Sequence, residues 1–80
     1  MKVKIIAVAA SREVLGGKSE DYIVLEENKS LLDLMNLLGI GLSHPYVYTI
    51  NEKITAPENY SKTKLCDNDT VKIVSIVSGG

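Results

Sequence analysis

The chain has little of what metalloproteins, disulfide-bonded proteins and nucleic-acid-binding proteins need. Its one cysteine, Cys66, cannot form an internal disulfide and provides no metal-binding cluster, which fits a reducing cytoplasm. We expect Cys66 to be a small buried or half-buried hydrophobic residue, with a redox or nucleophilic role as the alternative. Nine Lys and Arg residues against ten Asp and Glu residues give a net charge of −1. The basic excess typical of nucleic-acid-binding proteins is therefore missing, and we expect no nucleic-acid partner.

Long apolar runs are also missing. No segment approaches the roughly 18 to 20 apolar residues needed to span a bilayer, so we expect no membrane partner. The run from Ile5 to Ala10 follows Lys2 and Lys4 and has the outline of a short signal peptide. Because this run is at the short limit for such a segment and Arg12 follows closely, we interpret it as a strand in a cytoplasmic protein.

The usual groupings of catalytic residues are absent as well. The only histidine, His44, lies in a predicted loop, where a surface role is favoured over a general base or a metal ligand. Glu26 and Glu27 precede a predicted helix, where a solvated face or a helix-dipole contact is the ordinary interpretation. Gly39 and Gly41 follow a helix instead of opening one, so they do not form a phosphate-binding loop. We therefore expect a protein that is not an enzyme, with no metal and no bound cofactor.

What is present predicts a small α+β domain. Eighty residues make one domain, which can bury only roughly 60% of its unfolded surface. Period-two alternation and β-rich composition predict strands over 2–9, 21–25, 46–50 and 70–77, and apolar residues at helical spacing predict a helix over 31–38. The order is ββαββ. It fits a β-grasp fold, a mixed sheet packed on one main helix, in which the first and last strands are parallel neighbours.

Local signals mark the helix ends and the turns. Ser30 and Asp33 form a short-armed capping box at the start of the helix, and Gly39 ends it. Asn51 begins a turn after the third strand, the region from 55 to 64 is polar and irregular, and Asn68 can take a positive φ in the turn before the last strand. The apolar helix residues are expected in the core: Leu31, Leu32, Leu34, Met35, Leu37 and Leu38.

The last strand is followed by Ser78-Gly79-Gly80, so we divide the chain into a domain over 1–77 and a flexible tail over 78–80. Glycine loses the most entropy on ordering, so two glycines here stabilise nothing. Without side chains, Gly79 and Gly80 can enter a channel too narrow for other residues, and a free carboxylate on Gly80 is a chemical handle. The plain alternative is a frayed terminus or a truncated linker.

Alternation also predicts a docking surface beside the tail. On the outward face of the first strand two lysines come before two apolar residues, and on the last strand Lys72 comes before two apolar residues. Parallel pairing brings the apolar ends together next to the root of the tail, and such clusters are typical of protein interfaces. The predicted partner-binding residues are Ile6, Val8, Val74, Ile76, Val77 and Ser78. The alternatives are that the two faces are swapped or that a loop covers these residues.

Four segments in this order resemble the small subunit of molybdopterin synthase, the sulfur carrier of molybdenum cofactor biosynthesis. Residues 10–16 contain Arg12-Glu13 and Gly16 in the spacing of its Arg-Glu-x-x-Gly stretch, and Ile50-Asn51 matches its apolar-Asn step. Residues 65–73 resemble its Leu-x-Asp-Gly-Asp-x-Val-x-Ile segment, and 77–80 its Val-Ala/Ser-Gly-Gly terminus. The same features are shared with the wider ubiquitin-like sulfur carrier family, which includes the thiamine thiazole carrier.

The resemblance implies a ubiquitin-like fold and a function that needs no catalytic side chain in this chain. A ubiquitin-activating-type adenylating enzyme would use ATP to adenylate the Gly80 carboxylate, with Gly79 next to it in the tail. A sulfur donor protein carrying a persulfide would then convert Gly80 to a thiocarboxylate. The receiving partner would be a synthase large subunit or, in thiamine biosynthesis, a thiazole synthase. Two alternatives are a ubiquitin-like modifier joined to protein lysines through Gly80 and a binding module with an incidental tail.

Three departures bear on the pathway. Asn68 replaces the turn glycine, a change that the backbone permits, and Ser75-Ile76 stand where the molybdopterin carrier commonly has Pro-Pro. The short connection between the helix and the third strand leans toward the thiazole carrier. The sequence therefore indicates the family more firmly than the pathway.

Overall fold

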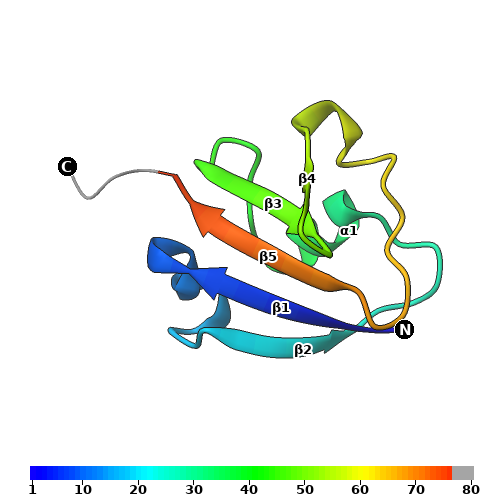
Figure 1. Ribbon diagram of the computed structural model, residues 1–80, viewed down its shortest axis with the longest axis horizontal. Coiled ribbons are helices and arrows are strands. Elements are labelled where there is room, and N and C mark those ends of the chain that lie inside the picture. The colour runs from blue at the N-terminus through cyan, green and yellow to red at the C-terminus, as the bar shows by residue number, and fades with distance from the viewer. Residues whose placement is uncertain (77–80) are drawn as a thin grey trace.

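The computed structural model describes residues 1–76 and contains a five-stranded mixed sheet with one α-helix on one face (Figure 1). The sheet order is β2-β1-β5-β3-β4, with β1 and β5 parallel and the other pairs antiparallel. In chain order the elements are β1 (Lys2–Val8), the 3-10 helix η1 (Ala9–Leu15), β2 (Glu20–Val24), α1 (Leu31–Leu37), β3 (Tyr46–Ile50), β4 (Lys53–Thr55), the 3-10 helix η2 (Pro57–Asn59) and β5 (Thr70–Ser75).

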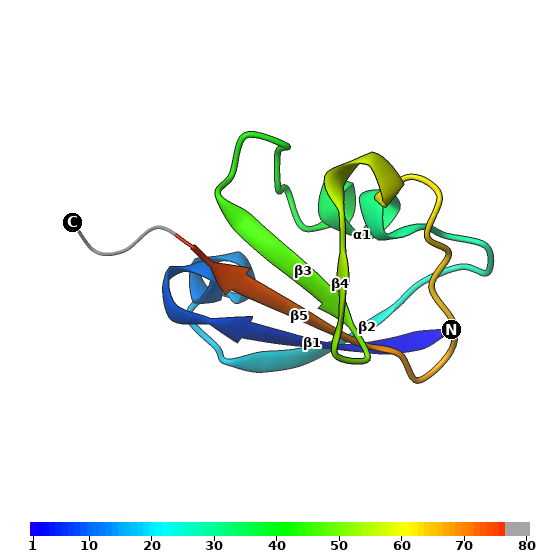
Figure 2. The same ribbon diagram turned by 45° about the horizontal axis from the view of Figure 1, so that its top comes forward.

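The core lies between the sheet and α1 (Figure 2). Alternate residues of β1 are buried, including Val3 and Ile5, and the corresponding residues of β5 are Val71 and Ile73. Tyr48 of β3 is also buried here. The helix contributes Leu31, Leu34 and Met35. Apolar residues on one side of each element explain this arrangement, because burial removes their surface from water.

The predicted β-grasp architecture and the parallel pairing of the first and last strands are confirmed, but the order ββαββ lacks one strand. β4 pairs antiparallel with β3 through a turn at Asn51 and Glu52, whose φ values are 50° and 72°. Positive φ at both positions is typical of a two-residue hairpin turn, in which the second position usually holds glycine. With Glu52 there and only three residues in β4, the sequence does not reveal the hairpin.

The predicted helix boundaries are nearly correct, since α1 ends one residue before Leu38. Ser30 and Asp33 form the predicted capping box: the Asp33 amide donates to the Ser30 hydroxyl at 3.2 Å, and the Ser30 amide donates to Asp33 Oδ2 at 2.8 Å. Gly39 follows the helix with φ 75°, and Asn68 takes the predicted positive φ of 71°. Strand β1 ends at Val8 and not at Ala9, because Ala9 is the first residue of η1.

Two burial predictions are wrong. Leu37 is 61% exposed, because it lies about 110° around the helix from the core-facing side. Cys66 is exposed, since the preceding residue, Leu65, points into the core. The Cys66 amide donates to Asp69 Oδ2 at 2.7 Å and so forms part of the turn that leads into β5.

Candidate partner-binding site

The sheet has one face that neither α1 nor η2 covers, called here the open face (Figure 1). Residues of neighbouring strands that share this face follow from the register: Val8 is opposite Val74, and Ile6 is opposite Lys72. Their neighbours in sequence, such as Ala7 and Ile73, are buried on the other face. Of the predicted docking residues, the structure therefore places Ile6, Val8, Val74 and Ile76 on the surface and not in the core.

We define the open-face patch as Ile6, Val8, Val74 and Ile76. Val8 is 39% exposed and Ile76 61% exposed, while Ile6 and Val74 are half-buried. Because exposed apolar side chains that cluster are typical of protein interfaces, this patch is the best candidate site on the described surface. Its role in binding stays a prediction.

The patch lies where β5 ends. The Ile76 amide donates to the Pro45 carbonyl oxygen at 3.0 Å, so the chain is still held beside β3 at this residue. Val77 and Ser78, predicted to extend the patch, and Gly79 and Gly80, predicted to carry the chemistry, lie outside the described residues.

Sequence reasoning missed Tyr22 and Val24 of β2, and two apolar open-face residues on the other side of β5. Val47 of β3 lies opposite Val74 and widens the patch toward β3. Ile54 of β4 lies opposite Thr49 and is 75% exposed at the edge of the sheet. Alternation along β3 would have found Val47 once its neighbours Tyr46 and Tyr48 were assigned to the core. Ile54 had no such signal, because β4 was not predicted.

The other end of the open face is polar. Lys4 forms an ion pair with Glu20 at 3.3 Å, and Lys2 Nζ lies 4.5 Å from the centroid of the Tyr22 ring. Both lysines come from the start of β1, as the alternation predicted. Along β1 and β5 the open face therefore changes from a polar end with lysines to an apolar end, and β2 adds the exposed side chains of Tyr22 and Val24 beside the lysines.

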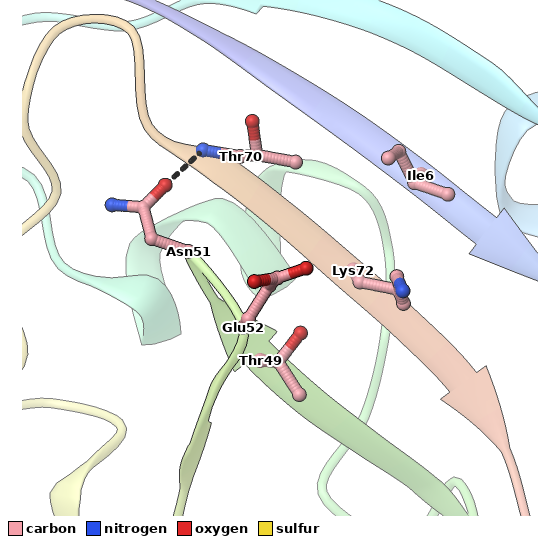
Figure 3. Close-up of a pocket in the computed structure, with 6 residues that line it drawn as sticks. All are labelled: Ile6, Thr49, Asn51, Glu52, Thr70 and Lys72. Atoms are coloured by element: carbon pink, nitrogen blue, oxygen red, sulfur yellow. Dashed lines mark hydrogen bonds between the residues drawn. The ribbon is translucent and has the colours of Figure 1, made fainter.

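Between the two ends lies a hollow (Figure 3). Its lining residues are Ile6, Thr49, Asn51, Glu52, Thr70 and Lys72. Ile6 belongs to both the hollow and the open-face patch, so the two surfaces are continuous. The Asn51 side chain forms two hydrogen bonds at the edge of this hollow. Its Oδ1 accepts from the Thr70 amide at 2.9 Å, and its Nδ2 donates to Asp69 Oδ1 at 2.8 Å. The Ile50-Asn51 step of the resemblance therefore joins the end of β3 to the start of β5.

The Arg12-Glu13 step lies in η1, beside the apolar end of the sheet. Arg12 is exposed, and its Nε donates to the Ala9 carbonyl at 3.3 Å. Glu13 accepts a hydrogen bond from the Tyr46 hydroxyl at 3.0 Å. Burial, and next this hydrogen bond, raise the pKa of Tyr46 above its ordinary value.

Other candidate sites are sparse in the part of the chain that the structure describes. Within residues 1–76, no group of three or more His, Cys, Asp or Glu side chains could hold a metal ion. His44 is exposed in its loop, where its Nδ1 accepts from the Gly41 amide at 3.0 Å. No helix of the described chain has the length and apolar character required to cross a membrane.

The mixed five-stranded sheet with α1 packed on one face defines a small β-grasp protein with a ubiquitin-like fold. The ThiS family model matches residues 5–80, and the chain therefore belongs to the ThiS family. The predicted membership of the ubiquitin-like sulfur carriers is thereby confirmed. Among curated proteins, no sequence matches the chain.

Solved structures share the fold. SAMP1 from Haloferax volcanii is similar over 100% of both chains, at 16% identity and a TM-score of 0.79. In a complex of subunits 1 and 2 of molybdopterin-converting factor from Helicobacter pylori, the matching chain is similar over 100% of both chains, at 16% identity and a TM-score of 0.69. The thiamine biosynthesis protein ThiS from Geobacter metallireducens is similar over 96% of this chain and 99% of its own, at 17% identity and a TM-score of 0.63. At these identities the likeness concerns the fold.

Proposed function

We propose that the protein is a cytoplasmic sulfur carrier that bears the sulfur on its C-terminal Gly80. The observation that carries this proposal is the ThiS family match, which runs through Gly79 and Gly80. The fold supports it, because β5 ends at the open-face patch and leads into the segment that contains the two glycines. A partner docked on the patch would therefore meet the chain just before its reactive end.

The proposed chemistry belongs mainly to the partners. In an adenylating enzyme, the Gly80 carboxylate oxygen attacks the α-phosphorus of ATP, and pyrophosphate leaves. The terminal sulfur of a persulfide on a donor protein then attacks the acyl carbon, and AMP leaves. A second thiol breaks the resulting sulfur–sulfur bond, which leaves a thiocarboxylate on Gly80 and a disulfide on the donor side. This carrier contributes the carboxylate and the docking surface and is not itself an enzyme.

Glycine at the last two positions suits this chemistry. The acyl carbon must reach an active site from which water is excluded, because an acyl adenylate hydrolyses readily. A residue without Cβ passes a narrow channel at no steric cost. We therefore propose that substitution of Gly79 or Gly80 by a larger residue blocks adenylation.

Mass spectrometry of the intact protein from its own organism tests the proposal. We expect a fraction of molecules to carry the mass increase of one oxygen-to-sulfur exchange at Gly80, and treatment with an alkylating reagent should modify that fraction. Gly-Gly remnants on lysines of other proteins would instead favour a protein modifier. Finding neither form in cells that need the carrier would contradict the proposal.

The recipient of the sulfur is proposed from the motif likeness and not from the fold. Arg12-Glu13, the 65–73 segment and the terminal motif favour a precursor of molybdopterin, with a synthase large subunit as the receiving partner. The known complex of subunits 1 and 2 of molybdopterin-converting factor supports a partner of this kind. The thiamine thiazole is the alternative, and copurification with a synthase large subunit or with a thiazole synthase decides between the two.

A further inference from the structure

Ser11 occupies an unusual place at the end of the β1–β5 pair. Its side chain is fully buried although the surrounding core is apolar. The hydroxyl accepts from the Val8 amide at 2.9 Å and donates to the Ile73 carbonyl oxygen at 2.7 Å. The Val8 carbonyl oxygen, at 2.8 Å, lies within reach of the same proton. One hydroxyl group therefore joins the last residue of β1 to the backbone of β5.

The register shows what this contact does. The Lys4 amide donates to the Asp69 carbonyl, and repetition along a parallel pair would direct the Val8 amide to the Ile73 carbonyl. Ser11 Oγ contacts both members of that pair. The hydroxyl is therefore hydrogen-bonded to both groups of the last backbone pair between β1 and β5. The chain enters η1 directly after Val8.

A second hydrogen bond connects η1 with β3, which lies on the opposite side of β5 from β1. The Tyr46 hydroxyl donates to Glu13 Oε1 at 3.0 Å, and Tyr46 lies opposite Ser75 in the β3–β5 pair. Through Ser11 and Glu13, η1 is thus bonded to β5 and to β3, the strand on the far side of β5. Both contacts lie within two residues of the last residue of β5 in register.

We propose that Ser11 is a positioning residue that fixes where β5 leaves the sheet, and thereby the direction in which the chain continues toward Gly80. The inference rests on the proposed function, because direction matters only if the following residues must enter a partner. A buried hydroxyl is costly unless it is hydrogen-bonded, and a satisfied buried network holds one arrangement against others. An apolar residue at position 11 would pack but would not connect Val8 with Ile73.

Substitution of Ser11 has a matched control in this chain. Ser11 and Ser30 are the two buried polar residues among residues 1–76. Ser30 caps α1 and is bonded to Asp33, away from the end of β5. Both Ser11→Ala and Ser30→Ala remove a buried hydroxyl, so both should destabilise the fold, but only Ser11→Ala should alter the end of β5.

The first measurement uses the free protein and does not depend on its function. Residual dipolar couplings of the Ser75 and Ile76 amides report the direction of this segment relative to the sheet. We expect them to change in Ser11→Ala and to remain as in the wild type in Ser30→Ala. Unchanged couplings in Ser11→Ala would overturn the inference.

The second measurement is ATP–pyrophosphate exchange catalysed by the organism's adenylating enzyme. Because Ser11→Ala keeps the side chains of Ile6, Val8 and Val74 in the open-face patch and is expected to move only Ile76, KM for the carrier should change less than kcat, which should fall about tenfold, as misplacement of a reacting group predicts. Ser30→Ala should keep both constants. If kcat is unchanged in Ser11→Ala, Ser11 has no positioning role.

Two further outcomes are distinguishable. If the wild-type carrier supports no exchange, the proposed function fails, whereas the couplings still decide whether Ser11 fixes the end of β5. If Ser11→Ala does not fold, Ser11→Cys replaces it, since a thiol fills nearly the same space and hydrogen-bonds only weakly. The inference then requires altered Ser75 and Ile76 couplings and a lower kcat in Ser11→Cys, and fails without them.

Discussion

Val8 and Val74 lie directly opposite each other across the parallel strands β1 and β5, on the open face of the sheet. Each is the last outward residue of its strand, so the pair marks the end of the sheet nearest to Ile76. On the same face, Lys2 and Lys4 lie at the start of β1, and Lys72 lies in the middle of β5. A partner that recognises the apolar end would therefore be directed to the side of the molecule where β5 leads toward Gly80.

The first prediction tests the open-face patch. We expect Val8→Asp to weaken binding to the adenylating enzyme or to the synthase large subunit by at least about 1 to 3 kcal/mol if Val8 is a hot spot. Because Val8 is partly exposed, the free energy of unfolding should fall by less than about 1 kcal/mol. Isothermal titration calorimetry and urea unfolding measure the two quantities.

Val24→Asp is the control for this prediction. Val24 is 76% exposed and shares the open face, but it lies opposite Lys2 at the polar end. Its substitution introduces the same charge away from the patch and should leave binding unchanged. Equal losses in the two variants would mean that the net charge of the carrier matters and the patch does not.

A second prediction concerns a buried hydroxyl without a partner. Among the described residues, Tyr48 has a buried hydroxyl that makes no hydrogen bond, and burial raises the pKa of Tyr48 above its ordinary value. Removing an unsatisfied buried group relieves its desolvation cost, so Tyr48→Phe should stabilise the fold by about 1 kcal/mol. Tyr46→Phe breaks the bond to Glu13 and should destabilise it by about 0.5 to 1.5 kcal/mol. Urea midpoints that move in the same direction would contradict this contrast.

The strands that were predicted correctly have a clear period of two. In β1 the apolar residues Val3 and Ile5 alternate with Lys2 and Lys4, so the inward face could be identified without coordinates. Parallel pairing with β5 followed from the order of elements, because a helix-containing crossover joins parallel strands. The open face was predictable for the same reason: it is the other half of the same alternation, with lysines first and apolar residues after them.

The failures arise where local signals are short or ambiguous. β4 has three residues, fewer than the pattern needs, and its hairpin turn holds Glu52 where glycine is usual. Leu37 belongs to an apolar run that is wider than the face that α1 can bury. The role of Ser11 could not be predicted at all, because it depends on the register between β1 and β5.

The third prediction concerns acid stability. The Ser30 amide, and next its hydroxyl, donate hydrogen bonds to the Asp33 carboxylate and lower the pKa of Asp33. The carboxylate therefore contributes stability above the unfolded pKa of about 3.9, and this contribution is lost as the pH falls through the lower folded pKa. In Asp33→Asn, the urea midpoint should depend less on pH below about pH 4. A slope equal to that of the wild type would mean that Asp33 does not contribute to the acid transition.

The last prediction tests whether Gly80 must carry a free carboxylate. One alanine added after Gly80 leaves residues 1–76, and hence the sheet and the open-face patch, as they are. Binding to the adenylating enzyme through the patch should persist, but the carboxylate now lies one residue farther along the chain and next to a Cβ. We therefore expect no exchange of pyrophosphate and no thiocarboxylate, with an unchanged free energy of unfolding. Mass spectrometry at the end of the assay must establish that the alanine is still present. If the intact extended protein accepts sulfur, the Gly80 carboxylate is not the reacting group. If the added alanine instead impairs folding or binding, the loss of exchange does not result from a displaced carboxylate, and the prediction fails.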